Sequence, residues 1–276
     1  MSGALYLVGT PIGNLGAFSP RAVEVLQEVD FIAAEDTRVS LKLLNHFGIK
    51  KPLVSYYEHN KNMSGEKILS RLLSGETCAL VTDAGMPAIS DPGEDIVRMC
   101  AQHGIDVFVV PGPSAVVSAL AVSGLPTTRW CFEGFLSVNK KERIPHLESL
   151  QNEMRTMIFY EAPHKLAQTL RALANALGNR EIAIVREITK IHDQVIRTFL
   201  CDAAEKYSEE ALKGEIVLII NGAPEQEKEN LSLEQAAEYA KELVHGGESK
   251  SDAAKIAAKE FGYKKGDIYK LLLEED

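Results

Sequence analysis

Short apolar runs alternate with amphipathic segments along most of the chain. Residues 19–29 show the second kind: Ser19 can cap a helix, Pro20 suits its first position, and apolar residues follow on one face. Strands that alternate with helices predict an α/β fold, with a mostly parallel sheet and helices on both faces. The first five strands are predicted at 4–8, 31–34, 53–57, 78–82 and 106–111.

A second α/β series follows. The segments 181–187 and 193–200 are too close together for a crossover helix, which predicts that they pair as antiparallel strands. A stretch rich in turn formers at 123–129 separates the two series, so we expect one α/β domain at 1–124 and another at 125–223. The strands of the second series are predicted at 130–136, 156–162, 181–187, 193–200 and 215–222.

The last part of the chain has a different pattern. Residues 224–230 are typical of an acidic linker, and 231–276 predict three short helices with glycine-bearing turns, as in a helix-turn-helix bundle. Residues 224–246 hold six glutamates against two lysines, whereas 249–265 hold five lysines against two acidic residues. The sequence leaves two roles open for this tail, nucleic-acid binding or a structural or dimerising role.

Composition narrows the class of protein. Hydrophobic residues make up 45% and charged residues 25% of the 276 residues, as in a globular domain. The longest apolar stretch, 115–122, is too short to cross a bilayer, and the first residues do not resemble a signal peptide, so we expect a cytoplasmic protein without a membrane segment. Four scattered cysteines without a C-x-x-C pair predict no metal site and no disulfide. A net charge of −9 argues against a broad electrostatic grip on nucleic acid.

The candidate functional residues lie mostly in the loops that follow the predicted strands. The carboxyl ends of strands in an open α/β sheet border the ligand crevice. The first such exit, "VGTPIGNLG", has three glycines, but its spacing is neither G-x-G-x-x-G nor that of a P-loop. The second, "AEDTR", ends in Glu35, Asp36 and Arg38. Both exits are predicted to face a ligand.

The densest exit is "TDAGMPAISDPGEDIV" at 82–97. Ser90 or Asp91 is expected to cap a helix that begins at Pro92, with the acidic pair 94–95 in its first turn. That explanation leaves "DAGMPAI" without a structural reason, so we interpret this part as a loop that offers backbone groups to a small ligand. Two more exits, "VVPGPSA" at 109–115 and "FYEAPHKL" at 159–166, share the same character.

Five motifs, in order, carry a resemblance to a known family. "LYLVGTPIGNL", "AEDTR", "TDAGMPAISDPG", "PGPSA" and "FYEAPHK" are similar to motifs of the tetrapyrrole-methylase superfamily and, more narrowly, of its ribosomal RNA small subunit methyltransferase I branch. The likeness spans about residues 4–222, and the helical tail resembles the extra domain of that branch. The resemblance implies two α/β domains with S-adenosylmethionine between them, a homodimer, and 2′-O-methylation of a cytidine in the decoding region of the small-subunit rRNA.

The resemblance also implies positions for the site. Cofactor contacts are expected from Gly85, Ile89, Ser90, Pro111, Gly112, Ser114, Ala115, Tyr160, Glu161, Arg186, Glu187, Gly214, Glu215 and Ile216. The substrate side is expected at Thr10, Pro11, Gly13, Asn14, Glu35 and Arg38. Apart from the resemblance, the charge pattern predicts RNA phosphate contacts at Lys140 and Lys141 and at the tail lysines 250, 255, 259, 264 and 265.

A base should help to remove the proton of a weakly acidic ribose hydroxyl. From its position we expect Asp36 in this role, with Asp83 and Asp91 as alternates and Arg38 orienting the substrate. Three other functions stay open: a precorrin methylase of the same superfamily, a Rossmann-type nucleotide-binding enzyme, and a ligand-sensing helix-turn-helix regulator. The basic tail and the "GTPIGNL" loop argue against the precorrin methylase, and the missing dinucleotide fingerprint and the differently patterned second α/β half argue against the Rossmann-type enzyme. The regulator is possible from the tail alone, and an assay for methyl transfer distinguishes it.

Overall fold

The computed structural model describes residues 3–224 and 232–273. It divides into two compact units, Met1–Ala223 and Pro224–Asp276, and each is described by itself. The expected acidic linker at 224–230 lies outside the described residues, apart from Pro224.

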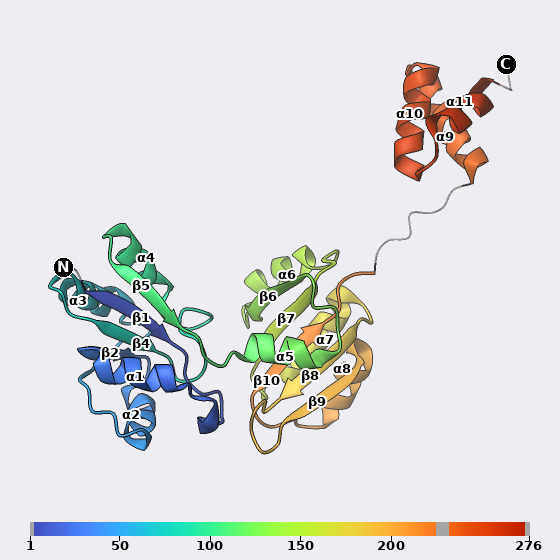
Figure 1. The fold of residues 1–276 in the computed structure, drawn as a ribbon. Coiled ribbons are helices and arrows are strands. Elements are labelled where there is room, and N and C mark those ends of the chain that lie inside the picture. The colour runs from blue at the N-terminus through green and yellow to red at the C-terminus, as the bar shows by residue number, and fades with distance from the viewer. Residues whose placement is uncertain (1–2, 225–231, 274–276) are drawn as a thin grey trace. The chain divides into compact units, whose positions relative to one another are not determined.

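The first unit begins with a fully parallel sheet of order β3-β2-β4-β1-β5 (Figure 1). All five strands fall within the predicted segments. Their bounds are β1 Ala4–Val8, β2 Phe31–Ala34, β3 Leu53–Ser55, β4 Cys78–Val81 and β5 Asp106–Val110. The connecting helices are α1 Pro20–Glu28, α2 Thr37–His46, α3 Lys61–Leu73 and α4 Glu94–Gln102, and a short 3-10 helix, η1, spans Leu15–Ala17.

The strands β2 and β4 are buried on both faces, as expected for the centre of a parallel sheet covered by helices. In β2, Phe31 and Ala33 join the core under α3 and α4, whereas Ile32 and Ala34 join the core under α1 and α2. Ser19 caps α1 by accepting from the backbone N–H of Ala22, as the sequence predicts. The strands therefore hold their carboxyl ends along one edge.

The second sheet is mixed, with order β6-β7-β10-β8-β9. Only β6 and β7 are parallel; β7–β10, β10–β8 and β8–β9 are antiparallel, and the last of these confirms the pairing predicted from the short connection. The strands are β6 Trp130–Phe135, β7 Thr156–Glu161, β8 Glu181–Arg186, β9 Gln194–Phe199 and β10 Ile216–Ile220. The helices α6 Lys140–Ser149, α7 Leu166–Leu177 and α8 Leu200–Glu209 contribute to the core on one face.

Helix α5, Ala115–Ser123, covers the other face of this second sheet. Val116, Ala119 and Leu120 pack against β7, β8 and β10. Arg197 of β9 donates from Nε to the carbonyl of Ser123 at 2.8 Å, which fixes the end of the helix. The helix just before the expected boundary at 124 thus packs with the strands that follow it.

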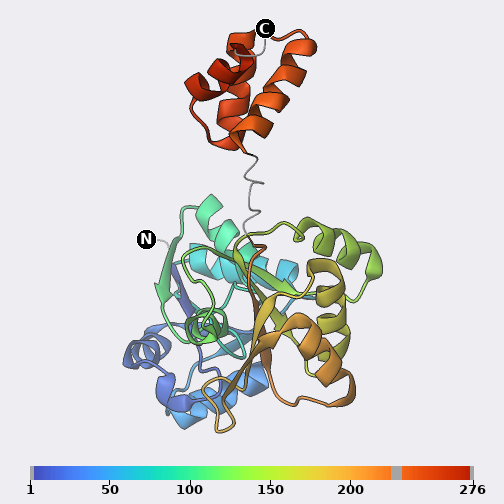
Figure 2. The same ribbon diagram turned by 90° about the vertical axis from the view of Figure 1, so that its right-hand side faces the viewer.

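Within its described residues, Pro224 and 232–273, the second unit holds three helices, α9 Leu233–His245, α10 Lys250–Phe261 and α11 Lys265–Leu273 (Figure 2). This confirms the predicted helical C-terminal part. Ser232 and Gln235 form a reciprocal capping box at α9, and Gly262 ends α10 in the left-handed conformation. The helices meet through seven buried alanines, with Ile268 and Leu272 beside them.

Within the described residues, no helix has the length and apolar character needed to cross a membrane. The same residues contain no group of three or more His, Cys, Asp or Glu side chains suited to a metal ion. The four cysteines are free thiols.

Candidate functional site

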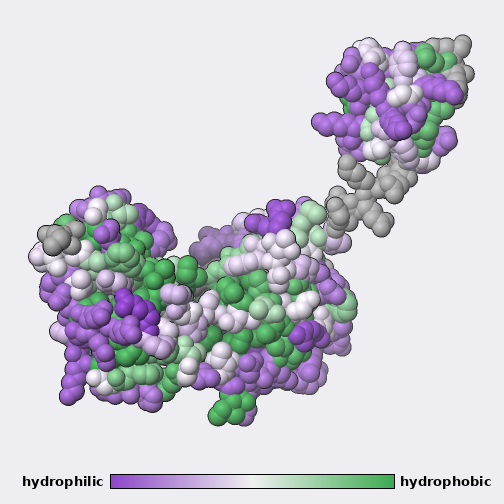
Figure 3. Space-filling model, viewed as in Figure 1, coloured by the Kyte–Doolittle hydropathy of each residue, from purple (hydrophilic) through white to green (hydrophobic). Residues whose placement is uncertain are grey.

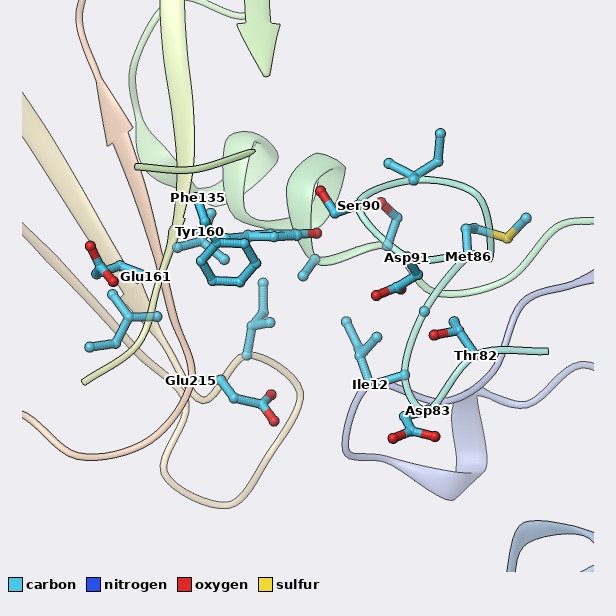
Figure 4. A pocket seen from close by; sticks show the side chains of 18 of the residues that line it. Ile12, Thr82, Asp83, Met86, Ser90, Asp91, Phe135, Tyr160, Glu161 and Glu215 are labelled. Atoms are coloured by element: carbon cyan, nitrogen blue, oxygen red, sulfur yellow. The ribbon is translucent and has the colours of Figure 1, made fainter. Parts of the chain in front are cut away.

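A pocket of about 430 Å³ lies in the first unit, at the carboxyl ends of β2 and β4 and at the facing ends of β7, β8 and β10 (Figure 4). Both α/β halves line it. The first half contributes Ile12, Glu35, 82–86, 89–91, Ser114 and Ala115. The second half contributes Phe135, 160–163, Val185, Ile188 and 215–217.

The loop after β4 forms one wall of this pocket, and hydrogen bonds to the loop after β1 hold it in place. The backbone N–H of Thr10 donates to the carbonyl of Gly85 at 2.9 Å, and the N–H of Gly85 donates back at 3.2 Å. The Thr10 hydroxyl, which is buried, donates to the carbonyl of Thr82 at 3.1 Å. Thr10 therefore supports the pocket wall and does not line the pocket itself.

The backbone of this loop is strained. Ala88 and Ser90 both have positive φ angles, 68° and 65°, although neither is glycine. Such conformations are sparsely populated by L-residues, and they cluster at ligand sites because the surrounding structure must hold them. The loop thus keeps a shape that its own residue types do not favour.

The same strain explains why the expected cap of α4 is wrong. The helix begins at Glu94 with Gly93 as its N-cap, not at Pro92 after Ser90 or Asp91. Gly93 has a φ of 153°, and a Cβ at this position would lie 2.8 Å from the Cβ of Ala88. The chain folds back on itself here before the helix can start, which leaves Ser90 and Asp91 to line the pocket.

Acidic side chains gather at this side of the pocket. Glu35, Asp83 and Asp91 all line it, and the Thr82 hydroxyl donates to Glu35 Oε2 at 2.6 Å. Burial, together with the negative charges of Glu35 and Asp83, raises the pKa of Asp91 to about 6. Burial and Glu35 also raise the pKa of Asp83. The cluster favours a cationic ligand or a proton in its midst.

Asp36 and Arg38 lie outside the lining. Asp36 caps α2, because its Oδ1 accepts from the backbone N–H of Arg38 at 2.8 Å. Its carboxylate also accepts from Arg38 Nε at 3.0 Å and from Nη2 at 2.6 Å. These hydrogen bonds lower the pKa of Asp36 to about 2, so its carboxylate is a weak base.

The loops after β1 and β5 approach each other closely. A Cβ built on Gly9 would lie 2.7 Å from the Cα of Gly112, so neither position has room for a side chain. Pro111 and Gly112 do not line the pocket, whereas the next residues, Ser114 and Ala115, bring the first turn of α5 to it.

The loop between β8 and β9 closes over the "GTPIGN" segment. Thr189 Oγ1 donates to the carbonyl of Ile12 at 3.3 Å, and a Cβ on Gly13 would lie 2.5 Å from Lys190 Cγ. Asn14 instead caps η1, and Gly13, Asn14 and Pro11 lie outside the pocket lining. The contact ties the two α/β halves together beside the pocket.

Glu187 positions Glu215, the pocket-lining residue directly before β10. Its Oε1 accepts from the backbone N–H of Glu215 at 2.9 Å and from Lys190 Nζ at 3.0 Å. A Cβ on Gly214 would lie 2.4 Å from Glu187 Cγ, which accounts for the glycine. Glu187, Gly214 and Arg186 lie outside the lining, but the first two hold Glu215 in it.

The far wall combines aromatic rings with an unpartnered carboxylate oxygen. Phe135 and Tyr160 pack with ring centroids 5.5 Å apart (Figure 4). Glu161 is buried and its Oε1 accepts from the N–H of Ala162, but Oε2 has no hydrogen-bond partner among the described residues. Because an unpaired buried polar atom is costly, Oε2 indicates a ligand donor at this wall.

Comparisons with known proteins agree with this architecture. The model of the Tetrapyrrole (Corrin/Porphyrin) Methylases family matches residues 4–204. The ribosomal RNA small subunit methyltransferase I of Synechocystis sp. is 45% identical over 99% of this chain and 98% of its own length. The chain belongs to the ribosomal RNA small subunit methyltransferase I family. The Bacillus subtilis protein of that name is 42% identical over 97% of this chain and 93% of its own, and the Thermotoga maritima one is 46% identical over 80% of this chain and 99% of its own.

Solved structures show the same fold at low identity. Diphthine synthase matches with a TM-score of 0.63 and 12% identity, over 80% of this chain and 90% of that one. Uroporphyrin-III C-methyl transferase from Thermus thermophilus, complexed with S-adenyl homocysteine, matches with a TM-score of 0.54 and 20% identity, over 79% of this chain and 97% of that one.

The structure of this methyltransferase-family chain brings about half of the expected site residues to one pocket. Those in its lining are Gly85, Ile89, Ser90, Ser114, Ala115, Tyr160, Glu161, Glu215, Ile216, Glu35, Asp83 and Asp91. Those outside it are Asp36, Arg38, Thr10, Pro11, Gly13, Asn14, Pro111, Gly112, Arg186, Glu187, Gly214, Lys140 and Lys141. Several of the latter support lining residues through the contacts described above.

Sequence reasoning missed a set of apolar and small lining residues. Phe135 could have been found, because it is an aromatic residue at the end of a predicted strand. Val185 and Val217 carry no such signal, because only the packing of α5 shows which face of the sheet opens to the pocket. The other lining residues that were not named as site residues are Ile12, Thr82, Ala84, Met86, Ala162, Pro163 and Ile188, although Ala84 and Met86 lie in the segment interpreted as a ligand loop.

The contact between Gly9 and Gly112 can be tested with one methyl group. We expect Gly9→Ala to destabilise the protein by about 1–3 kcal/mol, because the new Cβ meets backbone atoms that cannot turn away. Urea denaturation followed by the fluorescence of Trp130 measures this. Gly65→Ala, within α3, is the matched control: its Cβ would make ordinary van der Waals contacts with the side chains of Met99 and Tyr56, so stability should stay unchanged or rise. Equal stability of the two variants would contradict the close approach.

Proposed function

We propose that the chain uses S-adenosylmethionine to methylate the ribose 2′-oxygen of a cytidine in the decoding region of small-subunit rRNA. The observation that carries the proposal is the identity of 42–46% to ribosomal RNA small subunit methyltransferase I proteins. A pocket that combines carboxylates with aromatic rings is compatible with it. Such a substrate would place the enzyme in the cytoplasm, with the ribosomal subunits.

The residues of the pocket fit this cofactor. Its volume lies within the usual range for small-molecule sites, and the Phe135–Tyr160 wall suits a flat base. Glu161 Oε2 is a free acceptor for an amino group. The carboxylates of Glu35, Asp83 and Asp91 provide a negative potential for a sulfonium cation. S-adenosylmethionine, when bound, supplies an activated methyl group.

The chain's own groups would then align the ribose and accept its proton. Alignment contributes most to such a transfer, because the donor is already activated. The strained 82–93 loop and the two-way hydrogen bonding of Thr10 and Gly85 keep the wall in one shape, so little ordering is left for the binding step.

We propose Asp91, rather than Asp36, as the proton acceptor. Asp91 lines the pocket and its pKa of about 6 makes its carboxylate a stronger base than an ordinary aspartate. Asp36 is engaged by Arg38 and its pKa is about 2. Asp36 then has a supporting role: its backbone N–H donates to Asp83 Oδ1 at 3.2 Å and its carboxylate fixes Arg38.

Contacts to the RNA outside the pocket are proposed at two places. Lys140 and Lys141 are exposed in the first turn of α6, which Asn139 caps. In the second unit, Lys255, Lys259 and Lys264 are exposed on α10 and in the turn that follows. Both groups suit RNA phosphates.

A homodimer is proposed for the apolar edge of the first sheet. Strand β5 has only β1 beside it in the sheet, and its Phe108 and Val109 side chains are 48% and 62% exposed. Apolar surface is visible on the first unit (Figure 3). Natural proteins usually cover or charge an exposed apolar edge strand, and a second copy of the chain would cover this one.

The proposed activity is tested by incubating the protein with methyl-labelled S-adenosylmethionine and small ribosomal subunits that lack 2′-O-methylation. We expect label on one ribose of the decoding region. Cofactor binding without label in RNA would contradict the substrate, and label on a tetrapyrrole instead would move the chain to the corrin-modifying enzymes. Absence of cofactor binding would contradict the whole proposal.

The role of Asp91 predicts a specific pH dependence. Because a base must be ionised, the wild-type kcat/KM should rise as the pH passes about 6 and level off above it. Asp91→Asn should lower kcat by about 10²- to 10⁴-fold and abolish this inflection. Asp36→Asn is the control that should keep the inflection.

The substitution Asp91→Asn should also make the protein more stable at neutral pH. The pKa of Asp91 is higher in the folded protein than in the unfolded chain, so the folded state binds the proton of Asp91 more tightly. This difference contributes to the free energy of unfolding in full below pH 3.8, and the contribution is lost as the pH rises through about 6. Asp91→Asn removes that loss. An Asp91→Asn variant that is less stable at pH 7 and keeps full activity would rule out this account.

The dimer is tested by light scattering after size-exclusion chromatography. We expect twice the mass of the chain for the wild type, and a monomer for Val109→Lys, because a charge then enters the interface. Val138→Lys, at an exposed apolar residue after β6, is the control that should stay dimeric. A wild-type monomer at all concentrations would contradict the proposal.

A further inference from the structure

Two exposed aromatic side chains lie side by side directly after β3. The rings of Tyr57 and His59 are 6.4 Å apart between centroids and meet edge to face at 79°. Both side chains are exposed, Tyr57 to 41%. Neither residue lines the pocket, and the proposed activity so far gives them no role.

The turn that carries them is held by hydrogen bonds of its own. Asn60 Oδ1 accepts from the N–H of Tyr57 at 2.8 Å, and Asn60 Nδ2 donates to the carbonyl of Ser55 at 3.2 Å. Lys61 Nζ pairs with Glu58 at 2.7 Å and with Asp95 at 3.0 Å. The rings are thus presented on an ordered turn rather than buried for packing.

The sheet places this pair in line with the pocket. Ser55, Ala34 and Val81 are register partners across β3, β2 and β4. Two positions after these three residues come Tyr57, Asp36 and Asp83. They therefore lie at matching positions just beyond the same edge of the sheet. Neighbouring strands are about 4.8 Å apart, which puts the end of β3 about 10 Å from the end of β4. That span corresponds to one or two nucleotides of an extended single strand.

Arg38 is in the first turn of α2 and follows β2, the strand that lies between β3 and β4. Its side chain is 87% exposed, and the two hydrogen bonds that its guanidinium donates to the Asp36 carboxylate fix its plane. A fixed, exposed guanidinium can bind a phosphate or stack on a base. The edge therefore presents, in order, two aromatic rings, a planar cation and the acidic end of the pocket.

We propose that Tyr57 and His59 form a stacking platform for an unpaired rRNA base next to the nucleotide that enters the pocket, with Arg38 at the phosphate between them. This inference rests on the proposed function. Proteins recognise single-stranded RNA by stacking splayed bases on Tyr and His rings and on Arg planes. Stacking does not depend on net positive charge, which suits a chain with a net charge of −9.

The experiment compares the wild type with the double variant Tyr57→Ala, His59→Ala. Steady-state methylation of small ribosomal subunits should show kcat/KM lowered by about 5- to 100-fold, mainly through KM. Tyr57→Phe keeps the ring and should behave as the wild type. His103→Ala removes an exposed histidine at the C-cap of α4, at the opposite end of the strands, and should also leave kcat/KM unchanged.

Two further measurements separate this inference from the proposed function. The affinity for S-adenosylmethionine should be the same for all variants, because the platform lies outside the pocket. The affinity for a fluorescent, protein-free RNA of the decoding region should fall for the double variant alone. Equal RNA affinity of the wild type and the double variant would overturn the platform, whether or not methyl transfer occurs. A loss seen with subunits but not with free RNA would also overturn it, in favour of a ribosomal protein.

Discussion

The site depends on the close contact of three loops at one edge of the first sheet. The backbones after β1 and β5 meet at Gly9 and Gly112, and the bridge between Thr10 and Gly85 joins the loop after β4 to them. Because these contacts are made by backbone atoms, they allow little adjustment. The strained φ angles of Ala88 and Ser90 can persist only because these contacts hold the loop.

The electrostatics of the pocket follow from this arrangement. The loop after β4 cannot begin its helix before Gly93, so Asp91 stays partly buried beside Glu35 instead of serving as a solvated cap. A position that looks like ordinary helix capping in the sequence therefore becomes a carboxylate with a raised pKa. Asp36 shows the reverse, because a residue expected to be reactive is committed to capping α2 and to Arg38.

Periodicity predicted the ten strands of the first unit and the antiparallel β8–β9 pair, because those properties depend on local pattern and connection length. It did not predict the order of either sheet, and it placed α5 before a boundary although α5 packs on the second sheet. Both properties depend on contacts between distant segments. For the site, motifs found the glycine-rich and acidic loops, whereas apolar lining residues such as Val185 and Val217 depend on which face of the second sheet α5 packs against.

The alanine-rich core of the second unit has a thermodynamic consequence. An alanine side chain buries little apolar surface, so unfolding this unit exposes less of it per residue than unfolding the first unit, whose core holds Leu, Ile and Phe. The heat-capacity change of unfolding scales with that surface. The stability curve of the helical unit is therefore flatter, and its folding free energy varies less with temperature than that of the unit that holds the pocket.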